Sequence, residues 1–297
     1  MSLPLRIALC QHQSDPDPEV CWDRFREQAE EAARQGATLI VSQELFLAPY
    51  FCQGQDGKAF DLAEPVPGPA TERLRELSQR LGCVVVGSLF EKRAPGLFHN
   101  TAVVCDADGA LAGIYRKMHI PQDPGFDEKF YFAPGDLGFQ AFDTAVGRVG
   151  VLVCWDQWFP EAARLTALEG AEVILYPTAI GWDDLEDREI RPVQYQAWQT
   201  AMRAHAIANG VFVAASNRIG REGRLEFWGG SFVADPEGRI LHQSSHGGPE
   251  MAVVDCPRDR IGKVRQVWPF LRDRRIDAYG PITKRYLDQP STPEDRK

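Results

Sequence analysis

Short apolar runs that favour β-strands alternate with helical segments along the first third of the chain. The runs Arg6–Gln11 (RIALCQ) and Thr38–Gln43 (TLIVSQ) flank the segment Val20–Ala33, whose apolar residues recur at roughly helical spacing. A second helical segment, Ala70–Leu81, leads into a predicted strand at Cys83–Phe90. This alternation is typical of chains that build a mostly parallel sheet covered by helices.

The pattern changes in the middle of the chain, where two acidic turn sequences separate apolar runs. Asp106–Gly109 (DADG) and Asp235–Gly238 (DPEG) each predict a hairpin turn. Further strands are predicted at Arg148–Val153, Glu172–Tyr176 and Val211–Ala215, and further helices at about Phe159–Leu168 and Pro192–Asn209. Mixed strand–helix units and hairpins in one chain predict two mixed sheets covered by helices.

The domain organisation follows from the absence of a polar linker inside the chain. We expect a single α/β domain over residues 1–287, an α-β-β-α sandwich. Residues 288–297 (DQPSTPEDRK) are polar and contain proline, which predicts a flexible C-terminal tail.

Charge and hydropathy exclude two classes of function. The 297 residues include 33 Lys and Arg against 42 Asp and Glu, a net charge of −9, which argues against a nucleic-acid partner and favours small or cationic ones. The sequence has no apolar run of the ~18 residues that a membrane span needs, so we expect no membrane role. Its N-terminus lacks a basic segment followed by a long apolar stretch, so we expect a cytoplasmic protein.

Cysteine and histidine spacing argues against a structural metal site. The seven cysteines are odd in number and never form a C-x-x-C pair, which favours reduced thiols over disulfides or zinc ligation. His242 and His246 are four residues apart but are separated by a Ser-Ser pair rather than lying on a predicted helix. We therefore predict no metal.

Cys154 stands where an apolar strand (VGVLV) ends and a helix begins. A thiol at a helix N-terminus has a lowered pKa, so this position predicts a nucleophile with thiolate character. The alternative is that Cys154 only fills the core, because unpaired cysteines are among the most buried residues.

Two charged residues occupy similar strand-end positions. Glu44 follows the run TLIVSQ, and Lys117 follows LAGIYR. Side chains at such ends converge on the ligand crevice of α/β folds. Alternatively, each is the first solvated residue after its strand.

These residues lie in motifs that resemble the carbon-nitrogen hydrolases of the nitrilase superfamily. Glu44 in SQELFLAPYF, Lys117 in YRKMHIP and Cys154 in VLVCWDQWFPEAAR are similar, in the same order, to the Glu-Lys-Cys blocks of that superfamily. The segment HIPQDPGFDEKFYFAPGD resembles the stretch that holds its second glutamate, which corresponds to Glu128. The similarity covers nearly the whole chain and implies a nitrilase-like fold.

The resemblance implies a role for each of these residues. Glu44 would be the general base, Cys154 the nucleophile, and Lys117 the donor to the oxyanion together with the backbone N–H of Trp155. Glu128 would orient Lys117; its alternative is a surface ion pair with Lys129 or Arg116. No cofactor is expected, and the sequence has no phosphate-binding glycine motif after a strand.

Within the superfamily, CWDQWFPEAAR, YPTAIGW and HIPQDPGFDEKFYF most resemble the amidohydrolases that release putrescine from its ureido derivative on the agmatine route to polyamines. A small cationic ureido substrate implies an apolar tube with an acid at its far end. We predict Asp123 as an ammonium partner, and Trp155, Tyr50, Phe130 and Trp182 as lining residues.

The acidic loop 183–191 is a second feature suited to a cationic substrate. It holds five acids and two arginines, and we hypothesise that it steers the cation inward. The alternative is an ordinary solvated loop.

Three alternatives and one assembly expectation remain open. A ureidopropionase or ω-amidase would use the same Glu-Lys-Cys residues, and a carboxylate-bearing substrate would need an arginine such as Arg188, Arg191 or Arg203. A catalytically idle interaction protein would dock a partner through aromatic residues such as Trp268, Phe270 and Tyr279.

The family resemblance also implies a homo-oligomer built from dimers, and the segment after Cys256 mixes aromatic residues with arginines, as interfaces do.

Overall fold

Two six-stranded mixed sheets form the centre of the molecule. The computed structural model describes residues 3–287, so the predicted tail of residues 288–297 lies outside the described residues. The first sheet has the order β15-β1-β2-β3-β4-β5. Its strands are β1 (Arg6–Gln11), β2 (Leu39–Val41), β3 (Val84–Ala94), β4 (Leu97–Cys105), β5 (Leu111–Arg116) and β15 (Glu250–Asp255).

The second sheet has the order β14-β13-β10-β8-β7-β6, and its central strands β7, β8 and β10 are parallel. Its strands are β6 (Ala141–Thr144), β7 (Gly147–Val151), β8 (Val173–Thr178), β10 (Phe212–Asn217), β13 (Phe232–Ala234) and β14 (Ile240–Gln243). The predicted turns at Asp106–Gly109 and Asp235–Gly238 join the antiparallel pairs β4–β5 and β13–β14, which confirms both hairpins.

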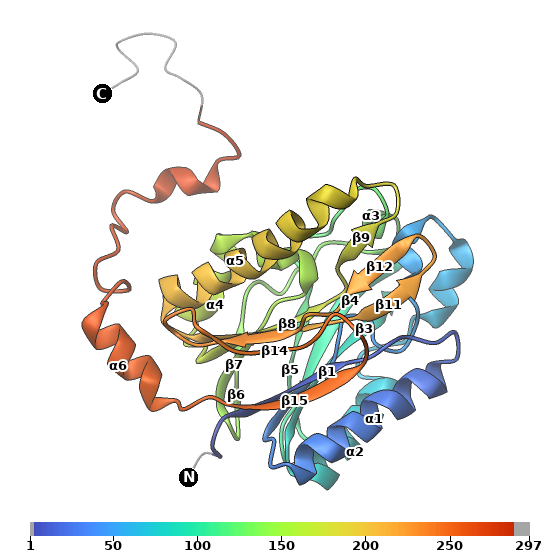
Figure 1. The fold of residues 1–297 in the computed structure, drawn as a ribbon, viewed down its shortest axis with the longest axis horizontal. Coiled ribbons are helices and arrows are strands. Elements are labelled where there is room, and N and C mark those ends of the chain that lie inside the picture. Colours follow the sequence, from blue (N-terminus) through green and yellow to red (C-terminus); the bar gives the residue numbers. More distant parts are fainter. Residues whose placement is uncertain (1–2, 288–297) are drawn as a thin grey trace.

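Helices cover the outer faces of both sheets, so the layers run α-β-β-α (Figure 1). On the first sheet lie α1 (Pro18–Arg34) and α2 (Pro69–Leu81), and on the second lie α4 (Pro160–Leu168) and α5 (Arg191–Asn209). Both α1 and α2 begin with a proline, whose fixed φ and missing N–H suit a helix start. The predicted single-domain sandwich of two mixed sheets is confirmed.

The two faces of the first sheet belong to different cores. In β1, Ile7 and Leu9 lie in the core between the sheets, whereas Ala8 and Cys10 lie in the core under α1 and α2. Successive side chains of a strand point to opposite faces, so a continuous apolar run is what a strand buried on both faces requires. This explains the sequence RIALCQ.

The remaining elements lie around one edge of the sandwich or follow it in the chain. The short strands β9 (Gly181–Asp183), β11 (Ile219–Glu222) and β12 (Leu225–Trp228) form a third sheet that the sequence did not predict. The short helices are α3 (Glu128–Tyr131), α6 (Asp259–Val267), η1 (Phe51–Gln53), η2 (Gly57–Leu62), η3 (Cys154–Trp158), η4 (Arg188–Ile190) and η5 (Gly280–Thr283).

The chain after α6 runs away from the two-sheet body (Figure 1). Apolar side chains along it are largely exposed, including Ile276 at 74% and Tyr286 at 79%. Among residues 3–287, no helix has the length and apolarity that crossing a bilayer requires.

Candidate active site

Cys154 lies in a sharp turn between the second sheet and α4. Strand β7 ends at Val151, and Cys154 begins the short 3-10 helix η3 with a positive φ of 42°. A non-glycine residue in this left-handed region is strained, and such residues persist only where their surroundings hold them. The side chain is 5% exposed, and its Sγ lies 3.8 Å from the carbonyl oxygen of Ala179.

Asp156, two residues further on, ties this turn to the segment around Lys117. Its Oδ2 accepts from the backbone N–H of Val153 at 2.9 Å and from the Tyr115 hydroxyl at 2.8 Å. Its Oδ1 accepts from the backbone N–H of His119 at 3.0 Å and lies 2.7 Å from Nδ1 of the same residue. Asp156 was not predicted as a site residue, because its partners lie in a segment distant in sequence.

Glu44 and Lys117 come from two strands of the first sheet and form a buried ion pair. Lys117 directly follows β5, and Glu44 lies in a turn three residues after β2. Lys117 Nζ donates to Glu44 Oε1 at 2.8 Å, and both residues are fully buried. The alternative of two separate solvated strand ends is therefore wrong for both residues.

Glu128 is the second carboxylate of this cluster. It is the first residue of α3, and both of its carboxylate oxygens accept from Lys117 Nζ, at 2.9 and 2.7 Å. The alternative of a surface ion pair with Lys129 or Arg116 is wrong, because Glu128 is fully buried and Arg116 pairs with Glu91 and Asp136 instead.

Tyr50 belongs to the carboxylate cluster. Its hydroxyl donates to Glu128 Oε1 at 2.7 Å, and its ring is buried. We predicted Tyr50 as a lining residue for substrate, whereas its contact here is with the carboxylate that holds Lys117.

Asn100 holds Glu44 from strand β4, which lies beside β5 in the first sheet. Its Nδ2 donates to Glu44 Oε1 at 2.7 Å, the oxygen that also accepts from Lys117. Among the described residues, the other oxygen, Oε2, is buried without a hydrogen-bond partner. This second carboxylate oxygen is thus available to accept a proton. Asn100 was not predicted as a site residue; it lies in β4 between two other polar residues, His99 and Thr101, so the pattern does not single it out.

Electrostatics couple Cys154 to this cluster. Burial raises the pKa of the Cys154 thiol well above its ordinary value, and the Glu44 carboxylate raises it further, against the opposing effect of Lys117. The predicted thiolate at a helix N-terminus is therefore wrong for the resting protein. The helix that begins at Cys154 is only a short 3-10 turn, and α4 starts at Pro160. A buried thiol beside a carboxylate keeps its proton until a base removes it.

The charges of Lys117 and Glu128 depend on each other. Burial alone would lower the pKa of the Lys117 ammonium, but the carboxylates of Glu128 and Glu44 hold that pKa well above its ordinary value. Burial raises the pKa of Glu128, and Lys117 opposes this shift while Glu44 adds to it. A positive Lys117 is thus held in place between the two carboxylates.

A cavity of about 460 Å³ opens over Cys154 and Glu128. Its lining is mostly apolar and aromatic, with two further carboxylates, and consists of Pro121, Asp123, Phe126, Glu128, Cys154, Trp155, Trp158, Ala179, Ile180, Gly181, Glu186, Gln194, Ala197 and Trp228. Asp123 and Trp155, both predicted from the sequence, are among these residues.

Two predicted lining residues lie elsewhere. The ring of Trp182 packs on Trp228 with centroids 5.3 Å apart, and its Nε1 donates to the carbonyl oxygen of Arg191. Phe130 is 40% exposed, and its ring contacts Phe60. Neither is among the described residues that line the cavity.

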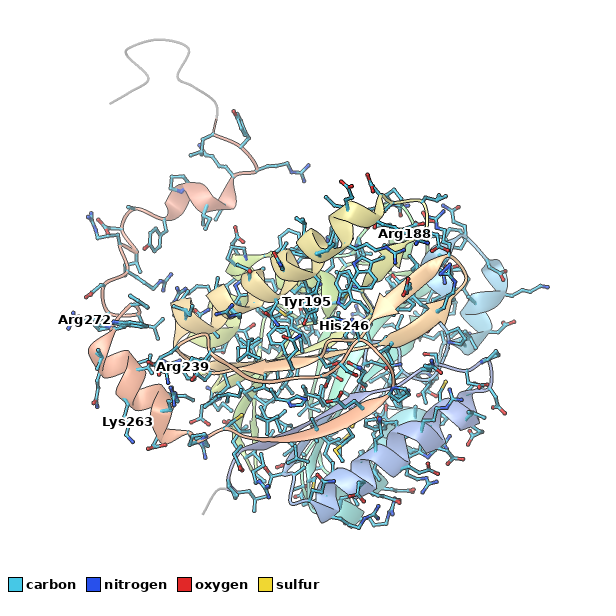
Figure 2. The ribbon with its side chains drawn as sticks, in the orientation of Figure 1. Arg188, Tyr195, Arg239, His246, Lys263 and Arg272 are labelled. Carbon is cyan, nitrogen blue, oxygen red and sulfur yellow. The ribbon has the colours of Figure 1, made fainter. Side chains whose placement is uncertain are left out.

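Two of the five acids in the acidic loop 183–191 form ion pairs with arginines. Asp183 pairs with Arg224 at 2.9 Å, and Asp184 pairs with Arg221. Arg188 lies on the outer part of this loop (Figure 2). Of the five acids in this segment, Glu186 is the one among the described residues that line the cavity.

His242 and His246 have separate partners. Nε2 of His242 lies 3.1 Å from the Glu250 carboxylate, and the His246 ring packs against Tyr195, which Figure 2 labels beside it. Among residues 3–287, no cluster of three or more histidine, cysteine or acidic side chains has a geometry that suits a metal ion.

A protein-family comparison agrees with this arrangement. The family model described as carbon-nitrogen hydrolase matches residues 6–266. The chain belongs to the carbon-nitrogen hydrolase family.

Individual relatives of the hydrolase match it over most of their length. N-carbamoylputrescine amidase from Solanum lycopersicum is 43% identical over 261 residues, 84% of each chain. Citrullinase from Francisella tularensis is 38% identical over 262 residues, 86% of this chain and 90% of the relative. The crystal structure of a carbon-nitrogen hydrolase from Helicobacter pylori G27 superposes with a TM-score of 0.93 at 44% identity and covers 96% of this chain and 100% of that one.

Proposed function

We propose that the protein hydrolyses N-carbamoylputrescine to putrescine, carbon dioxide and ammonia, with Cys154 as nucleophile. The observation that carries the proposal is a buried Glu44–Lys117–Glu128 cluster beside Cys154, at a mostly apolar cavity whose lining also includes Asp123 and Glu186. The similarity to an N-carbamoylputrescine amidase supports the same substrate.

The first step forms a bond between Cys154 Sγ and the ureido carbon. That carbon is weakly electrophilic because two nitrogens donate into it, so the thiol and the carbonyl both need activation. Glu44 Oε2, free of other hydrogen bonds among the described residues, takes the thiol proton as the C–S bond forms. Lys117, with the backbone N–H of Trp155, stabilises the resulting oxyanion; a preorganised donor of this kind contributes about 2.7 to 4 kcal/mol.

The second half of the reaction releases both products. The tetrahedral intermediate collapses, the bond to the terminal nitrogen breaks, and the proton held by Glu44 leaves with that nitrogen as ammonia. Glu44 then accepts a proton from water, which attacks the remaining S-carbamoyl ester and frees the Cys154 thiol. The carbamate that departs loses carbon dioxide and leaves putrescine. Glu128 keeps Lys117 oriented throughout.

The far end of the substrate is a butyl chain with an ammonium group. The aromatic side chains of Trp155, Trp158, Phe126 and Trp228 supply apolar surface for the chain. We assign the ammonium group to Asp123, whose Oδ1 is buried and has no hydrogen-bond partner among the described residues. A buried, unpaired carboxylate is costly, and a substrate cation would remove that cost.

A ureido acid fits this cavity less well. No arginine or lysine is among the described residues that line it. Arg191 pairs with Glu226 at 2.7 Å, and Arg203 donates to the carbonyl oxygen of Gly238. A ureidopropionase or a citrullinase needs a partner for a substrate carboxylate, and two cavity carboxylates would repel one.

Ammonia release from four compounds tests the proposal. The compounds are N-carbamoylputrescine, 3-ureidopropionate, citrulline and a simple ω-amide, each assayed with the wild type and with Cys154→Ala as the inactive control. We expect N-carbamoylputrescine to have the highest kcat/KM. Preferred turnover of 3-ureidopropionate or citrulline would refute the substrate assignment, and turnover by Cys154→Ala would refute the nucleophile.

We also propose that the protein self-associates through the segment after α6. Exposed Val267, Ile276, Ile282 and Tyr286 supply the apolar surface, and aromatic residues such as Trp268 and Phe270 are enriched at interfaces. Sedimentation of the full chain should give an even multiple of the monomer mass, and a monomer at micromolar concentration would contradict this. The cytoplasmic location stays a prediction.

A further inference from the structure

Arg218 is a fully buried arginine outside the cavity lining. It stands between β10 and β11, and its side chain has no exposed surface. A buried guanidinium must find its hydrogen-bond partners within the protein. The two Nη atoms of Arg218 bond to two groups of partners, whereas its Nε has no hydrogen-bond partner among the described residues. One group is the main chain of the Glu44 turn, and the other is the carboxylate of Glu222.

The main-chain contacts hold the turn that presents Glu44. Arg218 Nη2 donates to the carbonyl oxygens of Glu44 at 2.9 Å and Leu45 at 3.0 Å, and Nη1 donates to that of Ala48 at 3.0 Å. Leu45 has a φ of 46°, in the left-handed region that a leucine rarely adopts. The arginine therefore holds a turn that contains a strained residue.

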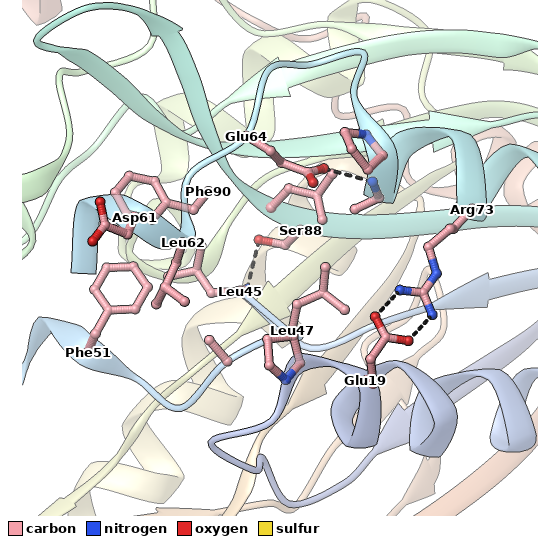
Figure 3. A pocket seen from close by; sticks show the side chains of 15 residues that line it. Glu19, Leu45, Leu47, Phe51, Asp61, Leu62, Glu64, Arg73, Ser88 and Phe90 are labelled. Carbon is pink, nitrogen blue, oxygen red and sulfur yellow. Dashed lines mark hydrogen bonds and ion pairs between the residues drawn. The ribbon is translucent and has the colours of Figure 1, made fainter. Parts of the chain in front are cut away.

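A second set of contacts holds the same turn from the opposite side. The backbone N–H of Leu45 donates to Ser88 Oγ at 3.0 Å, in the wall of a separate cavity (Figure 3). Ser88 Oγ in turn donates to Oδ1 of Asn100, the residue whose amide holds the Glu44 carboxylate. Removal of Arg218 would leave these contacts and a few long main-chain hydrogen bonds, such as that from the N–H of Glu44 to the carbonyl oxygen of Thr178 at 3.4 Å.

Glu222 extends the arrangement to the second carboxylate of the site. It accepts two hydrogen bonds from Arg218 Nη1, at 2.9 and 3.0 Å, and one from the backbone N–H of Tyr50. The Tyr50 hydroxyl donates to Glu128. One ion pair is thus connected to Glu44 through the main chain and to Glu128 through Tyr50, and these are the two carboxylates that hold Lys117.

We propose that Arg218 and Glu222 are positioning residues for the hydrolysis: together they set the distance between Glu44 and Glu128, and so the place of the Lys117 ammonium. The inference rests on the proposed roles of Glu44, Lys117 and Cys154. It requires arginine at position 218. A lysine has one nitrogen and cannot reach the three carbonyl oxygens and the carboxylate that the two guanidinium nitrogens reach.

The first test compares Arg218→Lys and Glu222→Gln with Arg258→Lys. The control also alters an arginine–carboxylate pair, that of Arg258 with Glu172, and neither of these two residues is among the described residues that line the cavity. With the best substrate of the panel, we expect kcat to fall by about 30-fold for Arg218→Lys and about 10-fold for Glu222→Gln, with KM within threefold. Arg258→Lys should keep both within twofold. Wild-type kcat in a folded Arg218→Lys or Glu222→Gln variant would overturn the inference.

A second test separates positioning from a general loss of structure. If Glu222 acts on Glu128 through Tyr50, the kcat loss from Glu222→Gln should be at least threefold smaller in a Tyr50→Phe background than in the wild type. Equal losses in both backgrounds would refute this connection. If Arg218→Lys does not fold, Glu222→Gln and this cycle still decide the matter.

A third measurement distinguishes failure of the inference from failure of the proposed function. Should the wild type hydrolyse none of the four compounds, the proposed function fails. The rate of Cys154 alkylation by iodoacetamide at pH 7 still reports on the base beside the thiol. We expect this rate to be at least fivefold lower in Glu222→Gln than in Arg258→Lys, and equal rates would overturn the inference whatever the substrate.

Discussion

Lys117 Nζ lies 2.8 Å from Glu44 Oε1, with neither side chain exposed to solvent. Each charge is tolerable only because the other is present, together with Glu128 and Asn100. A buried ion pair of this kind does not make the fold more stable than well-packed apolar residues in its place would. Its value is that the ammonium and the two carboxylates occupy fixed positions beside Cys154.

Replacement of Lys117 by alanine should abolish turnover and weaken the fold. Loss of one oxyanion donor lowers kcat by about 100- to 1,000-fold. The variant also leaves Glu44 and Glu128 facing each other without a cation, and breaking a buried pair costs about 3 to 5 kcal/mol. Ammonia release and urea denaturation measure the two effects. Unchanged kcat in a folded variant would contradict the role of Lys117.

Glu44→Gln should remove the base while keeping the shape of the site. The amide still accepts from Lys117 but cannot take the Cys154 proton, so we expect kcat to fall by about 100-fold or more, in the range of general-base catalysis. Glu172→Gln, which alters the partner of Arg258 instead, serves as control. A small effect of Glu44→Gln on kcat would show that another group accepts the proton.

Much of the fold follows from local patterns in the sequence. The runs that form β1 and β3 are buried on both faces, so their apolar side chains identify them without tertiary information. The prolines that open α1 and α2, and the glycines in the two acidic turns, mark boundaries for equally local reasons. The sheet of β9, β11 and β12 has strands of three or four residues, too short for a periodic pattern.

The site was predictable only in part. Glu44, Lys117 and Cys154 stand at or just after strand ends, a position that sequence reveals, and family resemblance added Glu128. The contacts that Asn100, Asp156 and Arg218 make in the site join residues between 37 and 174 positions apart in the sequence. Sequence patterns that depend on the spacing of nearby residues cannot predict such contacts. The thiolate prediction failed because burial and a neighbouring carboxylate outweigh a short helix.

Asp123 should make the reaction of a cationic substrate depend on pH. Burial raises the pKa of Asp123 to about 6. Below this pH the carboxyl group is neutral and no longer attracts the ammonium group, so KM for N-carbamoylputrescine should rise as pH falls through about 6. The simple ω-amide, which has no cation, supplies the control. In Asp123→Asn, KM for the cationic substrate should be high and flat over this range; a wild-type pH dependence in that variant would exclude Asp123 as the ammonium partner.

Asp156→Asn should disturb the Cys154 turn more than it disturbs the rest of the fold. The carboxylate accepts from the N–H of Val153 and the Tyr115 hydroxyl on one oxygen and from the N–H of His119 on the other. An amide group keeps one acceptor and turns an NH₂ group towards the other donors, which leaves a buried donor unsatisfied at a cost of about 1 to 3 kcal/mol. Because Cys154 has a positive φ that this network holds, the thiol should move away from Glu44, and kcat should fall by at least tenfold while KM changes little.

Urea denaturation together with steady-state kinetics decides the matter, with Asp143→Asn, an exposed aspartate in β6, as the matched control. Loss of stability without loss of kcat would mean that Asp156 supports the fold but not the position of the nucleophile.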